Sequence, residues 1–137
     1  MTDLLLDTCT VIWMGTGESI GEEAANQINE SYRKGRKICI SPISAWELGV
    51  LVAKEHVRLE RSVLDWFEAF TTQDGIVVTT LSPSILVNSW ALPGKPPKDP
   101  ADRIIISTAR ALNLAIVTRD LSILNYSNEG HVHAIYC

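Results

Sequence analysis

Short apolar runs alternate with helical patterns along this chain, and this alternation constrains its fold more than any other feature. The runs fall at residues 4–6, 37–40, 75–79, 114–118 and 131–136. Strands that read as continuous apolar runs and are separated by helices are typical of a parallel sheet covered on both faces. We therefore predict an α/β protein with three layers, α/β/α, around a central parallel sheet of about five strands.

Capping signals predict where the helices begin. Ser19 with Glu22 has the spacing of a capping box, and Ser62 with Asp65 has a similar form. Three further pairs place a capping residue directly before a proline, which suits the first position of a helix. These pairs are Ser41–Pro42, Ser82–Pro83 and Asp99–Pro100. We expect the corresponding helices to end near Gly35, Ala53, Trp90 and Leu112.

Length and hydropathy predict one domain that lies outside any membrane. The 137 residues fall within the common size range of a single domain, so we expect one domain over residues 1–137. No stretch approaches the roughly 18 apolar residues that a membrane span needs. The N-terminus has no basic region and only a short apolar run, unlike a secretory signal. We expect a cytoplasmic protein.

The cysteines and the net charge exclude little. Cys9, Cys39 and Cys137 are odd in number and widely spaced, so neither a zinc site nor a disulfide framework is indicated, and we expect buried free thiols. A net charge of −4 opposes tight nonspecific binding of nucleic acid. It also fits a site rich in carboxylates that becomes positive only when a metal binds.

Two basic groups have two interpretations each. One group is the run Arg33, Lys34, Arg36 and Lys37, and the other is Lys95, Lys98 and Arg103. Both groups fit ordinary solvated surface, and cations are favoured near the end of a helix. Either group would alternatively offset the acidic net charge along a path for RNA.

Two aspartates follow apolar strands. Asp7 comes directly after the first strand, and Asp120 comes two residues after the fourth. In a parallel sheet both lie at the carboxyl edge, where such folds bind their ligands. A single acid after a strand is usually a turn former or a helix cap. Two at the same edge are more suggestive of a site.

Glu47 interrupts an apolar stripe. Helical spacing places it on one face with Ile43, Val50 and Leu51. Burial of an unpaired carboxylate costs several kcal/mol, on the order of the penalty for any buried ion. A partly buried ion pair, a misjudged helix face and a shared metal ion each account for this residue, and the sequence leaves the choice open.

The segment from Asp99 to Asp102 mixes capping with chemistry. Asp99 suits the N-cap, and Asp102 then falls in the first turn, where a carboxylate favours the helix dipole. Capping alone explains both residues. Asp102 faces inward if Ile105, Ile106 and Ala109 pack inward.

Four acids from four segments would suit a hard divalent cation. Mg²⁺ prefers oxygen ligands and typically takes one or two carboxylates with waters and phosphate oxygens. Such an ion ionises a water and stabilises a leaving oxygen, which is the chemistry that a nuclease needs. No histidine is placed as a base, and we interpret His131 and His133 as residues on the surface of a strand.

Four motifs resemble those of the PIN-domain family, in particular the VapC-type toxins of type II toxin–antitoxin systems. In chain order they are Leu4–Thr8, Ile43–Gly49, Asp99–Ile106 and Val117–Asp120. The resemblance covers nearly the whole chain. It implies a parallel sheet between helices, an acidic site for Mg²⁺ or Mn²⁺, and endoribonuclease action on RNA.

The resemblance also implies roles for individual residues. By motif, Asp7, Glu47, Asp102 and Asp120 match the family's catalytic and metal-binding quartet. Asp99 belongs to the same motif and is a less certain ligand, and Thr8 and Thr118 match supporting hydroxyl positions. Members usually pair with a small VapB-type antitoxin and commonly form homodimers.

Three alternatives remain from the sequence. A noncatalytic PIN domain that binds RNA or protein is the nearest, and the intact quartet argues against it. A phosphoaspartyl enzyme of the haloacid-dehalogenase type would need a second aspartate where Cys9 stands. A response-regulator receiver shares the topology, but nothing clearly supplies its acidic pair.

Overall fold

The computed structural model describes residues 2–137, which form a five-stranded sheet in which all strands are parallel. The strands are β1 (Leu4–Leu6), β2 (Ile38–Ile40), β3 (Ile76–Val78), β4 (Ala115–Thr118) and β5 (His133–Tyr136). Their order across the sheet is β3-β2-β1-β4-β5. The predicted α/β class and the parallel sheet of about five strands are confirmed.

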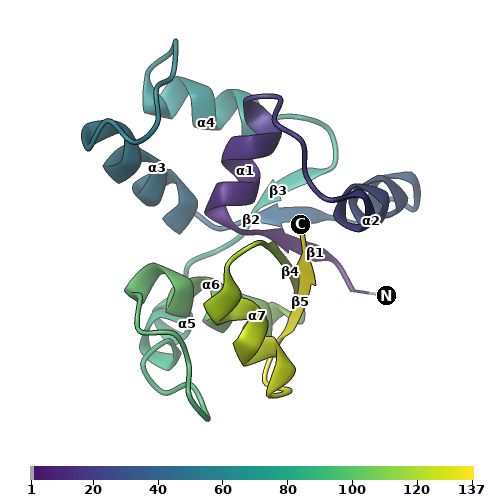
Figure 1. Ribbon diagram of the computed structural model, residues 1–137, viewed down its shortest axis with the longest axis vertical. Helices are drawn as coiled ribbons and strands as arrows, with labels where there is room; N and C mark the ends of the chain where they lie inside the picture. The colour runs from purple at the N-terminus through teal and green to yellow at the C-terminus, as the bar shows by residue number, and fades with distance from the viewer. Residues whose placement is uncertain (1) are drawn as a thin grey trace.

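Helices cover both faces of this sheet. They are α1 (Thr8–Gly15), α2 (Glu22–Arg33), α3 (Ile43–Ala53), α4 (Val63–Thr71), α5 (Pro83–Asn88), α6 (Pro100–Leu112) and α7 (Leu121–Asn128). Figure 1 shows α1 and α4 on one side of the sheet and α6 and α7 on the other. None of the helices formed by residues 2–137 has both the length and the apolar character of a membrane span.

The core lies in two clusters, one on each face of the sheet. Successive side chains of a strand point to opposite faces, so Leu4 and Leu6 join one cluster while Leu5 joins the other. The first cluster packs against α1, α2 and α4, and Phe67 and Phe70 come from the last of these. The second packs against α6 and α7. Burial on both faces explains why the strands have no polar alternation.

The strand order reverses beside β1, at the kind of position where open α/β sheets bind their ligands. From β1 the chain builds β2 and β3 on one side, and it later adds β4 and β5 on the other. The order therefore reverses between β1 and β4, which pair directly. Ligands of open α/β sheets bind outside the carboxyl ends of the strands at such a switch point. Asp7 and Asp120 follow these two strands.

Several helix boundaries differ from the prediction. The capping box at Ser19 and Glu22 is wrong, because α2 begins after Gly21 without a side-chain cap. The Gly21 N–H instead donates to the main-chain oxygen of Cys137, which ties this segment to the end of β5. Helix α3 begins one residue later than expected, with the Ser41 hydroxyl accepting from the Ile43 N–H at 3.1 Å.

The other boundaries were predicted more closely. Ser62, Ser82 and Asp99 cap α4, α5 and α6 as expected, although α5 ends at Asn88 rather than at Trp90. Helices α1 and α7 were not predicted, because a helix cap was only one of the interpretations of Asp7 and Asp120 and no helix was assigned after either residue. Those acids, Asp7 and Asp120, also cap the two helices.

The cysteine prediction is partly wrong. Cys39 and Cys137 are buried free thiols, as expected, but Cys9 is exposed. It lies in the first turn of the unpredicted helix α1, directly after Asp7 and Thr8. The absence of that helix from the prediction is the reason for the error.

Candidate active site

Asp7 is the most buried acid of the site. It ends β1 at the centre of the sheet, and its side chain is only 6% exposed. One carboxylate oxygen accepts from the Thr8 N–H at 2.8 Å, and the other accepts from the Thr118 hydroxyl at 2.8 Å. These two bonds fix both oxygens and join the ends of β1 and β4.

Glu47 reaches the same region from α3. The Thr8 hydroxyl donates to its carboxylate at 2.5 Å. The same Thr8 oxygen lies 2.8 Å from the hydroxyl of Ser44, one turn earlier on α3. Since the single proton of Thr8 goes to Glu47, Ser44 is the donor in this second contact. The chain of hydroxyls from Ser44 through Thr8 therefore orients Glu47.

Glu47 lies on a half-buried stripe of α3 and not on its most buried face. Ser44 and Leu48 are the buried residues of α3, whereas Ile43, Val50 and Leu51 are half-buried like Glu47 itself. Glu47 therefore lies at the border of the core, where it can reach both the protein and solvent. Half-burial reduces the cost of a charge on this stripe, and a shared metal ion stays a prediction for Glu47.

Asp120 is held by the start of α7 and by Thr118. Its carboxylate accepts from the N–H groups of Ser122 at 2.8 Å and Ile123 at 3.2 Å, and from the Ser122 hydroxyl. Its own N–H donates to the Thr118 hydroxyl at 3.0 Å. Because Thr118 also donates to Asp7, one threonine connects two of the predicted acids.

The structure separates Asp99 from Asp102. Asp99 is exposed, and its carboxylate accepts from the Asp102 N–H at 3.0 Å, which confirms it as the N-cap of α6. Asp102 is half-buried in the first turn, and Ile105, Ile106 and Ala109 behind it pack inward as expected. Its carboxylate is not used for capping.

Three of these acids have raised pKa values. For Asp7, Glu47 and Asp102 the largest cause is desolvation, and the charges of other carboxylates add to it. The pKa of Asp102 rises to about 8, with Asp120 as the first of the charged causes. Neighbouring negative charges and loss of water both disfavour the charged form of a carboxylate, so both raise its pKa.

The donor set fits a hard divalent cation that keeps part of its own shell. Within residues 2–137, no three His, Cys, Asp or Glu side chains come close enough to hold an ion by themselves. Mg²⁺ typically takes one or two carboxylates directly and completes its octahedron with waters and phosphate oxygens. Carboxylates that repel one another in a desolvated setting are the groups that such a charge would stabilise.

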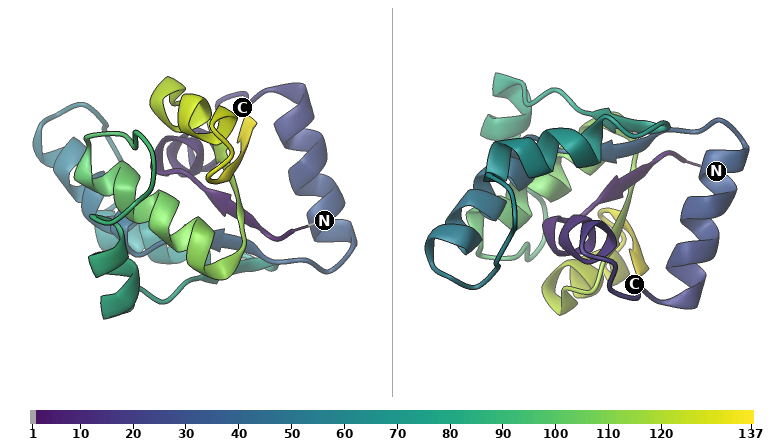
Figure 2. Two further views of the ribbon diagram at one scale, coloured as in Figure 1. Left: turned by 90° about the horizontal axis from the view of Figure 1, so that it is seen from below. Right: turned by 90° about the horizontal axis from the view of Figure 1, so that it is seen from above.

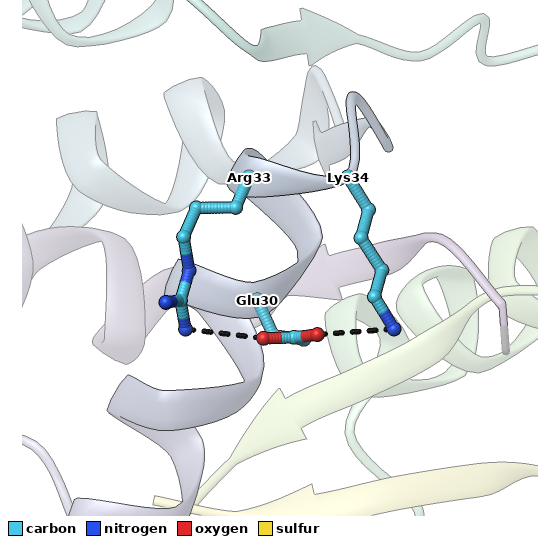
Figure 3. Close-up of polar contacts among 3 residues, drawn as sticks. All are labelled: Glu30, Arg33 and Lys34. Carbon is cyan, nitrogen blue, oxygen red and sulfur yellow. Dashed lines mark hydrogen bonds and ion pairs between the residues drawn. The ribbon is translucent and has the colours of Figure 1, made fainter.

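The first basic group does not lie among the acids, whereas Arg103 of the second group directly follows Asp102 in α6. The run that includes Arg33 and Lys34 ends α2 and precedes β2, so it lies at the amino edge of the sheet, opposite the site. Figure 2 shows α2 at one end of the molecule and α3 at the other. Glu30 forms ion pairs with Arg33 at 3.1 Å and Lys34 at 3.0 Å (Figure 3). Arg103 stacks over the Trp90 ring, with its guanidinium carbon 4.8 Å from the ring centroid.

Three residues near the acids were missed or misjudged by sequence reasoning. Ser44 and Ser122 bond to the supporting threonine and to Asp120, and the Ser44 contact spans 36 positions, so no local pattern indicates it. Cys9 is exposed beside the cluster. Desolvation of its sulfur and then the surrounding negative charges, Asp7 first, raise its pKa to about 11. His131 precedes β5 and packs against Tyr126, away from these acids.

Comparison with known proteins finds a matching family and a relative. The PIN domain family matches residues 4–128. Ribonuclease VapC22 of Mycobacterium tuberculosis (strain ATCC 25618 / H37Rv) is 31% identical over 120 residues, which are 88% of this chain and 88% of that protein.

Solved structures share the fold over the whole chain. VapBC2 from Rickettsia felis, bound to a DNA fragment from its promoter, matches with a TM-score of 0.69 at 16% identity and covers 97% of each chain. DNA-bound VapBC from Salmonella typhimurium matches with a TM-score of 0.65 at 22% identity, over 99% of this chain and 98% of that one. At these identities the two structures support the arrangement of the elements.

Proposed function

This chain belongs to the PIN-domain family, and from that premise we propose that it is an endoribonuclease that depends on Mg²⁺ or Mn²⁺. The observation that carries the proposal is the meeting of acids from four elements at one edge of the sheet. Asp7 follows β1, Glu47 and Asp102 lie in α3 and α6, and Asp120 lies in the turn after β4. The curated relative, named as a ribonuclease, supports the reaction.

In this mechanism the carboxylates would bind the ion, and neighbouring threonines orient the carboxylates. Asp7 and Asp102 would hold the ion, and Glu47 and Asp120 would bind the waters around it or a second ion. Thr8 and Thr118 keep three of the carboxylates in place through the bonds described above. A bound Mg²⁺ or Mn²⁺ supplies the positive charge that ionises a water and stabilises the phosphodiester as it breaks.

Three helix starts favour an anionic substrate at the same edge. Helices α1, α6 and α7 begin at Asp7, Asp99 and Asp120, so the positive ends of their dipoles point toward the site. These dipoles offset part of the acidic charge and favour phosphate groups. Together with the ion they would let an acidic protein bind RNA at this place.

The proposal is tested with purified protein and total cellular RNA. We expect cleavage with Mg²⁺ or Mn²⁺, none with a chelator, and one class of mapped cut ends. Cleavage that persists in the chelator would overturn the metal dependence. Protein that binds both Mn²⁺ and RNA without cleaving would favour the noncatalytic alternative.

We further propose that the chain is the toxin of a toxin–antitoxin pair and acts in the cytoplasm. The structural relatives are complexes named VapBC, which supports a VapB-type antitoxin as the partner. A groove of about 690 Å³ beside α1 and α4 offers it a site of mixed character, lined by Met14, Trp66, Phe70 and Ile76 together with charged residues such as Arg58 and Arg61. Expression of the wild-type chain alone should arrest growth, and expression of Asp102→Asn should not.

A homodimer is part of the same proposal. Leu86, Val87 and Trp90 expose apolar surface along α5 and the turn after it, with Val87 68% exposed. Large apolar side chains gathered on one surface are typical of a protein interface. Light scattering on the purified chain should give twice the monomer mass. The Val87→Asp variant should give the mass of a monomer.

A further inference from the structure

Arg119 stands between the two residues that organise half of the acidic site. Thr118 before it donates to Asp7, and Asp120 after it belongs to the quartet. The Arg119 side chain extends elsewhere. Its guanidinium carbon lies 3.9 Å from the centroid of the Trp13 ring on α1. A guanidinium N–H group donates to the main-chain oxygen of Cys137 at 3.0 Å.

These contacts join separate parts of the chain around one turn. The Cys137 oxygen that accepts from Arg119 also accepts from the Gly21 N–H, and the Cys137 N–H donates to the Thr118 oxygen at 3.0 Å. Trp13 lies on the helix whose first residue, Thr8, bonds to Glu47. The turn that carries Asp120 is therefore tied to the end of β5 and to α1.

We propose that Arg119 is a positioning residue, which fixes the turn between β4 and α7 and thereby aims Asp120 at the site. The carboxylate of Asp120 caps α7, so a shift of this turn would change the cap and the direction of the acid together. Asp7 and Thr118 are buried in the sheet, and Asp120 is the acid whose place depends most on a surface turn. The consequence for cleavage rests on the proposed function.

Arginine suits this role better than lysine. Its planar guanidinium stacks on an aromatic ring while its edge donates to a main-chain oxygen. Lysine keeps the charge but has no flat face and no fixed fork. Arg119→Lys therefore weakens the positioning while it preserves the net charge of the chain.

Hydrogen exchange of two backbone amides tests the proposal without relying on activity. The N–H groups of Ser122 and Ile123 donate to the Asp120 carboxylate, so their exchange reports its place. In Arg119→Lys we expect both amides to exchange about tenfold faster. Trp13→Leu, which keeps an apolar side chain without a flat ring, should give a smaller increase at the same two amides.

Arg110→Lys is the matched control. Arg110 also donates to a main-chain oxygen, that of His131 at 2.6 Å, but before β5 at the amino edge of the sheet. It should leave the amides of Ser122 and Ile123 unchanged. Unchanged exchange in both Arg119→Lys and Trp13→Leu would overturn the proposal.

Kinetics then separate positioning from plain stability. Arg119→Lys should lower kcat about tenfold with the KM for RNA unchanged, whereas Arg110→Lys should keep kcat. Faster exchange with unchanged kcat would overturn the role in catalysis. A wild-type chain that cleaves no RNA would refute the proposed function instead, and the exchange data would still decide whether Arg119 positions Asp120.

Discussion

The two edges of the sheet handle crowded charge in opposite ways. At the amino edge, Glu30 lies between Arg33 and Lys34, and its hydrogen bond with Lys34 and the nearby positive charges lower its pKa (Figure 3). At the carboxyl edge, desolvation and other carboxylates raise the pKa of Asp102 to about 8. The first cluster is neutralised by its own side chains. The second requires protons or a cation from outside, which is what distinguishes a binding site from ordinary charged surface.

The largest contrast between the edges should be in cleavage. Asp102→Asn removes a carboxylate that we propose as a ligand of the ion, so we expect cleavage of one defined RNA to fall by roughly 100- to 1,000-fold or more. Glu30→Gln changes the same chemical group at the other edge and should leave the rate unchanged. Both rates are measured with saturating Mn²⁺. Equal rates for Asp102→Asn and wild type would remove Asp102 from the mechanism.

The two edges should also respond to pH with opposite signs. The folded chain holds a proton on Asp102 up to about pH 8, whereas the unfolded chain releases it near pH 3.8. Folding therefore takes up a proton between these values, and stability without metal should fall as pH rises through the window, by up to about 1.4 kcal/mol per pH unit. The lowered pKa of Glu30 acts the other way, because its contribution is lost as pH falls below its usual 4.5.

Urea unfolding of the metal-free chain between pH 5 and pH 8 measures this dependence. Asp102→Asn should flatten the curve, and saturating Mn²⁺ should do the same for the wild type. A wild-type stability that rises from pH 5 to pH 8 without metal would contradict the assigned shift.

A smaller effect separates a cap from a ligand within the carboxyl edge itself. Asp99→Ala should lower the free energy of unfolding by about 0.5–2 kcal/mol, because the Asp102 N–H loses its acceptor. Asp99→Asn still caps and should keep normal stability and much of the activity. Thermal melting and cleavage are measured for both. An Asp99→Asn protein that folds normally but cleaves nothing would make Asp99 a ligand or an anchor for metal-bound water.

The smallest effect is expected at the amino edge. Glu30→Gln breaks two exposed ion pairs, which contribute little because water screens them. We expect a melting temperature within experimental error of the wild type, at low and at high salt. A marked loss of stability would mean that this cluster does more than cover the end of α2.

The sequence predicts the parts of the fold that depend on local signals. Apolar runs located the strands, and capping residues such as Ser62 and Asp99 located helix starts. The same reasoning missed α1 and α7, because Asp7 and Asp120 act at once as strand ends, helix caps and members of the cluster. A possible cap at either residue does not give the length of a helix after it, so neither helix was assigned.

The site shows the same division. Its acids are named by motifs, whereas the groups that orient them come from distant positions. Thr8 meets Ser44 and Glu47 only because α1 packs against α3, and Arg119 meets Cys137 across the end of the sheet. The exposed Cys9 and the half-buried face of Glu47 likewise depend on how helices pack. Such contacts follow from tertiary structure and not from spacing along the chain.

We propose that the carboxyl edge of the sheet binds a divalent cation, and that the cation displaces protons from the acids there. Calorimetric titration of the metal-free chain with Mn²⁺ at pH 7, in two buffers that differ in ionisation enthalpy, measures binding and proton release together. We expect binding with the release of about one proton per chain, because Asp102 with a pKa of about 8 is mostly protonated at this pH. We expect weaker binding with little proton release in Asp102→Asn. Failure of the wild-type chain to bind Mn²⁺, or binding with no proton released, would contradict a cation site at this edge.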